Sequence, residues 1–321
     1  MAGAPPVSPR AAHLILNRLI SMIYKIFRVS TILSADSVTW TVRVFIVLWS
    51  ILVIAPLLLL LAFSFFETRS YMTVYDPSLK TWISLFESGR FEVALRTMRI
   101  AVTVTLIELI LAFPFALWLA KGCKSKGTKA VFLALLTIPF FLDLSSRSIV
   151  WRAILGQAGG VNTALMQLGV ISEPIDWLLY SEFSVHFGMI APYFPTMFLP
   201  IFLVISLIDD DLINASNDLG ASPAQTLRRV IIPLSLPGIL AGIVITLGPA
   251  LAAWVEPGML GGGFVNLLSH SIESAYTALR YPVVAALSAF VIVLLAVLLV
   301  CVVLVVRRAA NIENIFRQMH T

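Results

Sequence analysis

Ionisable residues at four positions in this chain lie in or beside strongly apolar stretches. Glu108 is near the middle of one stretch, and Asp143 and Arg147 are four residues apart in the next. Glu256 follows Trp254 near the end of a third stretch. Charged groups are costly to bury in lipid, so such residues usually face a cavity or a partner. We therefore expect Glu108, Asp143 and Glu256 to make part of a path attractive to a cation, which Arg147 and Trp254 also line.

A structural explanation of the same residues stays open. Asp143 and Arg147 share a helix face and can form an ion pair. Glu108 can bind a neighbouring helix, and Glu256 can cap a loop. Unchanged uptake after alanine substitution at Glu108 or Glu256 would favour this explanation.

A polar segment at about residues 209–235 separates two apolar stretches and has the composition of a docking loop. Its first helix is expected to end at Gly220, because glycine accepts the left-handed conformation that follows many helices. Ser222 suits the N-cap of a second helix, with Pro223 at the first helical position and Gln225 completing a capping box. The small side chains of this segment allow another protein to approach closely.

Two prolines, Pro233 and Pro237, are expected to end the second helix before the next apolar stretch. Arg228 and Arg229 fall near its C-terminal end, where cations suit the helix dipole. The candidate docking residues of this segment are Asn214, Ala215, Ser216, Asp218, Gly220, Ala221, Ser222, Pro223 and Pro233.

Residue patterns typical of enzymes are missing from the sequence. No Gly-rich pattern ends in Gly-Lys-Ser/Thr, so the chain is not expected to bind or hydrolyse ATP. The histidines show no metal-ligand spacing, and no serine lies in a nucleophile-elbow pattern. We expect no catalytic residue, no metal site and no cofactor in this chain.

The composition is that of a membrane protein. The 321 residues are 59% hydrophobic and 12% charged, with a mean hydropathy of +0.96. Soluble domains carry about twice that charged fraction. The net charge of +5 does not indicate nucleic-acid binding, because the charges cluster at the ends of apolar stretches. Cys123 and Cys301 are too few for a disulfide framework.

Six apolar stretches come close to the roughly 20 residues needed to cross a bilayer. They lie at about residues 43–65, 97–120, 130–152, 185–207, 237–255 and 282–306. Prolines interrupt the fourth and fifth stretches, which membrane helices tolerate when neighbours satisfy the backbone. The sequence therefore predicts an all-α membrane protein with about six transmembrane helices.

Residues 42–308 are expected to form the membrane domain, between a lead-in at residues 1–41 and a tail at 309–321. Apolar residues of the lead-in recur at roughly helical spacing, which favours an interfacial helix. A partly disordered tail is the open alternative.

The distribution of lysine and arginine predicts the orientation of the spans. The loop at residues 153–183 has three acidic residues and no lysine or arginine. The short loop after the second span contains Lys121, Lys124, Lys126 and Lys129. The positive-inside rule then places both termini and the docking loop in the cytoplasm. The first external loop is an exception, with Arg69, Lys80, Arg90 and Arg96.

Aromatic residues near the outer ends of the spans are expected to be interfacial anchors. They include Trp151, Trp177, Tyr180 and Tyr193.

The docking loop resembles the EAA loop of binding-protein-dependent ABC importer permeases. That family reads roughly Glu-Ala-Ala, three residues, Gly, and then a hydrophobic-Pro ending. Asn214-Ala215-Ser216, Gly220 and Ile231-Ile232-Pro233 stand in those places. Beyond about residue 40 the chain resembles the spermidine/putrescine-type permease subunits. This wider resemblance includes Arg147 with Trp151, residues 177–183, residues 219–223, Pro249, Glu256-Pro257 and Leu260-Gly261-Gly262.

The resemblance has two departures. Asn214 replaces the glutamate of the family, and Ser216 replaces its second alanine. In the family this loop is the coupling helix that seats in a cleft of the ATPase subunit. The missing carboxylate puts any ion pair there in doubt, whereas the small-residue face and Gly220 still favour docking. An ordinary solvated loop is the alternative.

The resemblance implies a multi-pass permease of the type I ABC importer fold in the bacterial inner membrane. It implies cytoplasmic ATPase subunits that use ATP, an external solute-binding protein, and a second permease that the family pattern favours as non-identical. Membrane lipid is the other expected partner, and nucleic acid is not expected. The implied substrate is a small polyamine-like solute.

Two other classes of function stay open at this point. One is a self-contained transporter or channel driven by an ion gradient, with Glu108 and Asp143 as relay groups. The other is a structural membrane subunit of an enzyme complex. Co-purification of an ATPase would separate the importer from both.

Overall fold

The computed structural model describes residues 35–69, 72–87 and 89–309. The chain divides into two compact units, residues 1–59 and 60–321, each described by itself. Helix α2 (Ala35–Phe63) accounts for the described part of the first unit and ends just inside the second. The expected interfacial helix at residues 1–41 falls largely outside the described residues, as does the tail at 310–321.

The second unit is mainly helical. Short strands β1 (Glu67–Arg69) and β2 (Met72–Val74) form an antiparallel hairpin that pairs Glu67 with Val74, an element that the all-helical expectation missed. The helices are α3 (Lys80–Glu87), α4 (Arg90–Leu117), α5 (Lys126–Thr137), α6 (Leu144–Leu155), α7 (Gly160–Gln167), α8 (Glu182–Leu207), α9 (Asp210–Asp218), α10 (Pro223–Thr226), α11 (Ile232–Ala252), α12 (Val255–Leu260), α13 (Leu268–Thr277) and α14 (Tyr281–Ala309).

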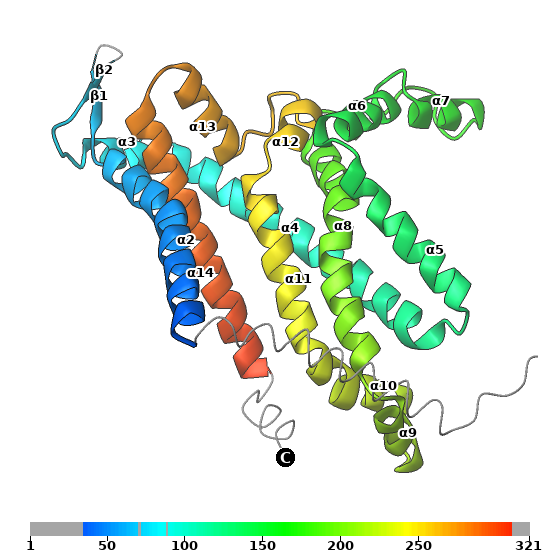
Figure 1. Ribbon diagram of the computed structural model, residues 1–321. Helices are drawn as coiled ribbons and strands as arrows, with labels where there is room; N and C mark the ends of the chain where they lie inside the picture. Colours follow the sequence, from blue (N-terminus) through cyan, green and yellow to red (C-terminus); the bar gives the residue numbers. More distant parts are fainter. Residues whose placement is uncertain (1–34, 70–71, 88, 310–321) are drawn as a thin grey trace, which may run out of the picture. The chain divides into compact units, whose positions relative to one another are not determined.

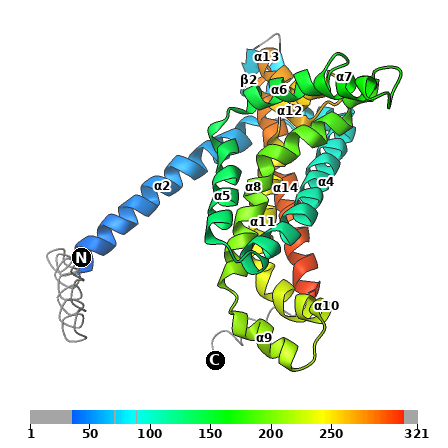
Figure 2. The ribbon, with the colours of Figure 1, turned by 90° about the vertical axis from the view of Figure 1, so that its right-hand side faces the viewer.

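Helices α4, α8 and α11 form the centre of the second unit (Figures 1 and 2). Their buried side chains include Met197, Phe198 and Ile201 of α8, each with no exposed surface. Two glycines of α11 allow the close approach to α8. A Cβ on Gly238 would lie 2.7 Å from the carbonyl oxygen of Pro200, and one on Gly242 would lie 2.9 Å from that of Met197. Small residues at such crossings let membrane helices pack backbone to backbone.

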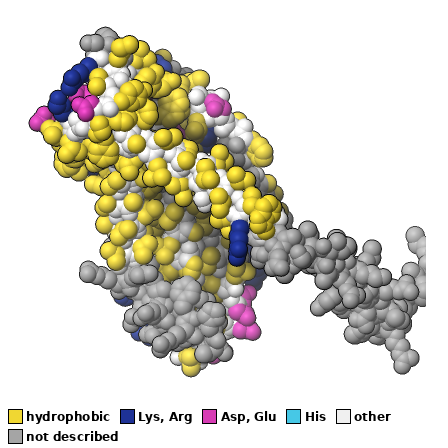
Figure 3. Space-filling model, turned by 60° about the vertical axis from the view of Figure 1, so that its left-hand side comes forward, with side chains coloured by type: hydrophobic (Ala, Val, Ile, Leu, Met, Phe, Trp, Pro, Cys, Tyr) yellow, Lys and Arg dark blue, Asp and Glu magenta, His cyan; other side chains and the backbone are white. Residues whose placement is uncertain are grey.

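The second unit has two distinct ends (Figure 2). Helices α9 and α10 lie together at one end, whereas α6, α7, α12 and α13 lie at the other. Figure 3 shows one face of the molecule, on which hydrophobic side chains predominate and the charged ones lie mainly near its two ends. This distribution is the one that a bilayer requires.

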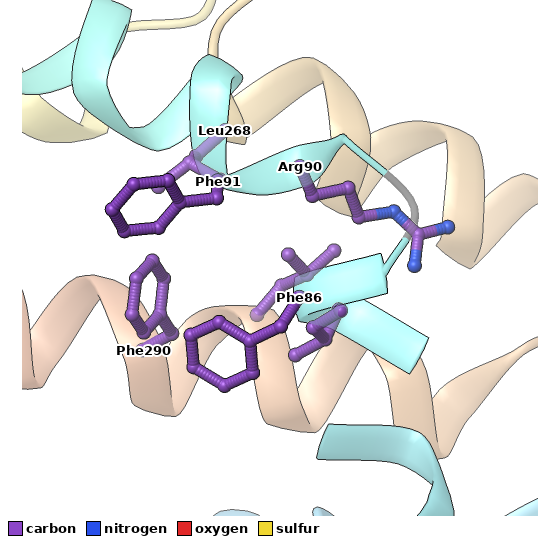
Figure 4. A pocket seen from close by; sticks show the side chains of 7 residues that line it. Phe86, Arg90, Phe91, Leu268 and Phe290 are labelled. Carbon is purple, nitrogen blue, oxygen red and sulfur yellow. The ribbon is translucent and has the colours of Figure 1, made fainter. Parts of the chain in front are cut away.

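A smaller apolar cluster joins α3 and α4 to α13 and α14. Phe86, Phe91 and Phe290 turn their rings toward the same space beside Leu268, while the guanidinium of Arg90 points away from them (Figure 4). The gap left between these side chains is only about 10 Å³, little more than a water site. We therefore regard it as part of the core and not as a binding site.

Five described helical stretches are long and apolar enough to cross a membrane. They are Trp40–Phe63, Arg90–Gly122, Asp176–Leu207, Pro223–Ala252 and Tyr281–Leu304. They coincide with five of the six predicted spans. The predicted third span, 130–152, is instead divided into α5, a 3-10 turn at Ile138–Phe141 and α6. A single helix there was the wrong expectation, because Pro139 lies in that turn and Asp143 starts a new helix.

The expectation that Pro233 and Pro237 end the second helix of the docking loop was also wrong. Helix α10 continues through a π-helical turn at Leu227–Ile231 into α11, and both prolines lie within α11. A π-turn widens the helix by one residue, which relieves the clash between a proline ring and the preceding turn. The docking loop is thus continuous with a central membrane helix.

Three of the four cations that departed from the expected charge pattern have acidic partners. Arg69 and Lys80 lie 2.9 and 3.7 Å from a carboxylate oxygen of Glu67. Arg96 lies 3.9 Å from Glu182. These ion pairs reduce the excess positive charge of the segment at residues 66–96.

Candidate coupling loop and buried polar site

Helix α9 has a defined start and a defined end. The side chain of Asp209 accepts a hydrogen bond from the backbone N–H of Asp211 at 3.0 Å. At the other end Gly220 has a φ of +77°. The N–H groups of Gly220 and Ala221 donate to the carbonyls of Asn217 and Ser216 at 2.9 and 3.1 Å. This pair of bonds is a Schellman cap and confirms the predicted role of Gly220.

Helix α10 begins with the predicted capping box. The N–H of Ser222 donates to Oε1 of Gln225 at 2.8 Å, and the N–H of Gln225 donates to Oγ of Ser222 at 3.4 Å. Pro223 occupies the first turn, where its missing N–H is not needed. Because α10 runs on into α11, a force on this turn acts directly on a membrane helix.

A hydroxyl pair braces α9 against α10. Oγ of Ser216 and Oγ1 of Thr226 lie 3.0 Å apart, and Thr226 is only 4% exposed. Sequence reasoning treated Ser216 only as a small residue and missed this contact. The available signal was a pair of hydroxyl residues on either side of a capped turn.

Most of the predicted docking residues are on the surface. Asn214, Ala215, Asp218, Gly220, Ser222 and Pro223 are exposed, whereas Ser216, Ala221 and Pro233 are half-buried. Sequence reasoning missed Leu219, whose side chain is 89% exposed at the tip of the loop. An exposed leucine beside small residues is an apolar surface suited to contact with another protein.

A second group of polar residues is buried among the central helices and the short helix α12. Glu108 comes from α4, Tyr193 from α8 and Glu256 from α12, with exposures of 0%, 8% and 2%. The Tyr193 hydroxyl lies close to the Glu256 carboxylate. Arg147 of α6 acts electrostatically on both Tyr193 and Glu256, and Glu108 acts on Tyr193. We call Glu108, Arg147, Tyr193 and Glu256 the buried polar site.

Several atoms of this site have no hydrogen-bond partner within the described part of the chain. They are both carboxylate oxygens of Glu108, Oε1 of Glu256 and Nε of Arg147. Buried polar atoms are nearly always paired, because an unpaired one costs about 1–3 kcal/mol. Unpaired carboxylate oxygens are acceptors for N–H donors, and an ammonium group would supply such donors.

Three of the five predicted path residues, Glu108, Arg147 and Glu256, lie close enough to Tyr193 to act on it electrostatically. Asp143 is exposed and is the N-cap of α6, where it accepts from the N–H groups of Ser145 and Ser146 at 2.9 and 3.2 Å. The expected Asp143–Arg147 ion pair is absent among the described residues, because Asp143 precedes the helix and its carboxylate binds the backbone.

Trp254 also lies apart from the buried polar site. It is 56% exposed and precedes α12. It lines a mainly apolar pocket of about 540 Å³ between the end of α11 and helices α13 and α14. Its inclusion with the path residues therefore finds no support in the geometry.

The prediction for Tyr193 was wrong, because this residue is buried and is not an interfacial anchor. It shares a face of α8 with Met189 and Met197, which lie four residues to either side and are fully buried. That spacing was the signal by which the sequence could have placed Tyr193 in the interior.

The sequence profile of the family described as "Binding-protein-dependent transport system inner membrane component" matches residues 101–311. The chain is 32% identical to the spermidine/putrescine transport system permease protein PotB of Escherichia coli over 273 residues, which cover 84% of this chain and 96% of that protein. It is also 32% identical to PotB of Haemophilus influenzae over 249 residues, covering 77% and 86%. The inner membrane ABC transporter permease protein YdcU of Escherichia coli is 30% identical over 230 residues, covering 67% and 72%.

The fold is similar to that of a solved bacterial ABC transporter involved in the import of the acidic polysaccharide alginate. The TM-score is 0.64 with 18% sequence identity, and the match covers 88% of this chain and 99% of that one. This likeness concerns the fold alone. The family match, the relatives and the apolar helices together identify a multi-pass protein of the bacterial inner membrane. The chain belongs to the family of inner membrane components of binding-protein-dependent transport systems and is a permease subunit of such an importer.

Proposed function

We propose that this permease imports a small polyamine-like cation, with spermidine or putrescine as the preferred substrate. The observation that carries this proposal is the buried polar site, in which three carboxylate oxygens of Glu108 and Glu256 lack partners among the described residues. The relatives named for spermidine/putrescine transport support the same substrate class.

The proposed complex contains cytoplasmic ATPase subunits, a second and non-identical permease, and an external solute-binding protein, all held in membrane lipid. ATP is hydrolysed by the ATPase subunits. This chain supplies no catalytic, metal-binding or cofactor-binding group in the proposal.

The loop formed by α9 and α10 docks on the ATPase from the cytoplasmic side. Leu219 and the small residues around Gly220 form the contact surface, and Asn214 leaves it without the carboxylate expected at that position. Helix α9 follows α8 closely, and α10 continues into α11. Closure of the ATPase dimer therefore displaces α8 and α11, and this displacement drives alternating access.

In the membrane, an ammonium group of the substrate satisfies the carboxylates of Glu108 and Glu256. Hydrogen bonds between charged groups are roughly twice as strong as neutral ones. Arg147 offsets one of the two negative charges when both acids are ionised. The site therefore retains a net attraction for cations without holding a polyamine too tightly to release it.

The test is uptake of labelled putrescine and spermidine into proteoliposomes that contain the complete importer. Glu108→Gln and Glu256→Gln should each lower uptake by about tenfold or more at low substrate, since each removes a buried charge partner. Glu92→Gln is the matched control, because Glu92 lies on the same α4 helix but is exposed. Wild-type uptake by both site variants would remove these residues from the path.

A second arm of this experiment tests the energy source. The proposal requires uptake that depends on ATP and on the binding protein. Uptake by the chain alone, without ATP and sensitive to an ionophore, would instead establish a gradient-driven transporter.

A further inference from the structure

One lysine joins three helix ends on the side of the docking loop. Lys121 lies in the π-helical turn Trp118–Gly122, which continues α4. Its Nζ donates to the backbone carbonyl of Ile208, at the C-terminal end of α8. The same Nζ donates to Oδ1 of Asp210, the first residue of α9, at 2.6 Å. The lysine side chain is only 17% exposed, whereas that of Asp210 is 75% exposed.

The contacts of Lys121 with Ile208 and Asp210 hold the end of α4 to the ends of α8 and α9, and we call them the clamp. The last carbonyls of a helix have no partner within it, and the negative end of the helix dipole lies there. The Lys121 ammonium satisfies one such carbonyl and also pairs with Asp210. Its hydrogen bond and charge hold the pKa of Asp210 below the usual range. The Asp210 carboxyl therefore stays ionised at neutral pH.

The backbone does not link α4 directly to the docking loop, so the Lys121 contact supplies that connection. Helices α8 and α11 are linked to the docking loop along the backbone, but α4 reaches the loop only through side chains. Lys121 is 13 residues beyond Glu108 on one continuous helical stretch, Arg90–Gly122. At about 1.5 Å per residue, the lysine and the glutamate lie roughly 20 Å apart along this helix.

We propose that Lys121 is a positioning residue that transmits movement of the docking loop to α4, and thus to the Glu108 side of the buried polar site. This inference rests on the proposed coupling function of the loop. The charge pattern assigned Lys121 only to the cytoplasmic side, whereas its contacts give it a mechanical role.

The test compares three single variants of neighbouring lysines in the complete importer, reconstituted with its ATPase subunits and binding protein. Lys121→Gln removes the ammonium, whereas Lys124→Gln and Lys126→Gln remove the same charge from exposed lysines nearby. Neither control lysine has an ion pair or side-chain hydrogen bond among the residues that the structure describes. The measurements are membrane level, recovery of the ATPase subunit, and the ratio of solute transported to ATP hydrolysed.

Lys121→Gln should lower the ratio of transport to hydrolysis by about tenfold, because glutamine lacks the charged donor that joins Ile208 and Asp210. Recovery of the ATPase should stay at the wild-type level, because the docking surface is unchanged. Lys121→Arg should restore much of the ratio, since it keeps a cationic donor. Asp210→Asn should have a smaller effect than Lys121→Gln, because the carbonyl contact remains.

Three results would overturn the inference: a wild-type ratio in Lys121→Gln, an equal loss in the two control variants, or an equal loss of ATPase recovery and of transport. If Lys121→Gln does not accumulate in the membrane, the test relies on Asp210→Asn and Lys121→Arg. A wild-type ratio of transport to hydrolysis in Asp210→Asn, together with complete loss of transport in Lys121→Arg, would contradict the clamp. Failure of this inference differs from failure of the proposed function. Unchanged transport by Gly220→Pro would reject the coupling loop itself, whereas unchanged transport by Lys121→Gln alone would reject only the clamp.

Discussion

The docking loop and the buried polar site satisfy their polar groups in opposite ways. In the loop, Asp209, Gly220 and Ser222 close the ends of two short helices with local hydrogen bonds. In the buried polar site, Glu108 and Glu256 come from different helices and keep unpaired oxygens. A segment that transmits force needs a fixed shape, whereas a site that passes a substrate needs partners that the substrate can supply. We therefore call the docking loop the stiff element and the buried polar site the receptive element.

The largest effect is expected from Gly220→Pro, which attacks the stiff element. Gly220 has a φ of +77°, and proline is locked near −65°. The variant should still insert in the membrane, but transport and the ATPase activity stimulated by the loaded binding protein should both be abolished. The measurements are membrane abundance, uptake and phosphate release. Normal transport by Gly220→Pro would show that the docking loop does not need a fixed shape to transmit force.

The receptive element is tested next by Tyr193→Phe, which removes the hydroxyl beside the Glu256 carboxylate. Leaving a buried acceptor unpaired costs about 1–3 kcal/mol, so we expect a change of about tenfold in the substrate concentration for half-maximal uptake. ATPase recovery should not change. Tyr180→Phe is the matched control, because Tyr180 lies outside the buried polar site. An equal shift in both variants would assign the effect to general packing.

A smaller effect is expected from the brace between α9 and α10. Ser216→Ala leaves the buried Thr226 hydroxyl unpaired, so coupling should fall by a few-fold, as for a net hydrogen bond of about 1 kcal/mol. The double variant Ser216→Ala/Thr226→Val should be closer to wild type than Ser216→Ala, because no partner is then left unsatisfied. The measurement is solute transported per ATP in Ser216→Ala, in Thr226→Val and in the double variant. If the effect of the double variant equals the sum of the two single effects, the two hydroxyls are not in direct contact.

The smallest effect is expected from pH. The pKa of Asp210 is lowered by Lys121, so this pair contributes fully above the ordinary carboxylate range and is lost only as the pH falls through the lowered value. We vary the pH on the loop side between about 6 and 8 and measure solute transported per ATP in Asp210→Asn and in wild type. The variant's value divided by the wild-type value should not change with pH in this range. A pH-dependent difference within that range would show that Asp210 is not held ionised by the lysine.

The sequence predicted the local features of the molecule well. Gly220 ends α9, and Ser222 with Gln225 opens α10, because such caps depend on residues only a few positions apart. Five apolar spans were also found, since their signal is the length and composition of a continuous stretch.

Three other features were not predicted. The turn at Ile138–Phe141 divides a stretch that is apolar enough to read as one helix. Tyr193 resembled an interfacial aromatic, but packing of α8 against its neighbours buries it. Asp143 and Arg147 had the spacing of a helical ion pair, yet the backbone N–H groups of the new helix compete successfully for the carboxylate. Packing between helices explains Tyr193, whereas a proline turn and a helix cap explain the other two features.

The π-turn at Leu227–Ile231 has a consequence for insertions and deletions. One residue of an α-helix corresponds to about 100° of rotation, and a π-turn accommodates one residue more than an α-turn. The turn therefore takes up one residue without changing the angular phase between the tip of the loop at Leu219 and the α8-facing side of α11. Deletion of a single residue here would restore an α-turn and keep both the phase and every cap, whereas deletion of one residue from the regular part of α11 would rotate the contact surface by about 100°. At the base of its contact surface this permease thus has one residue that can be lost without changing the direction in which the surface faces.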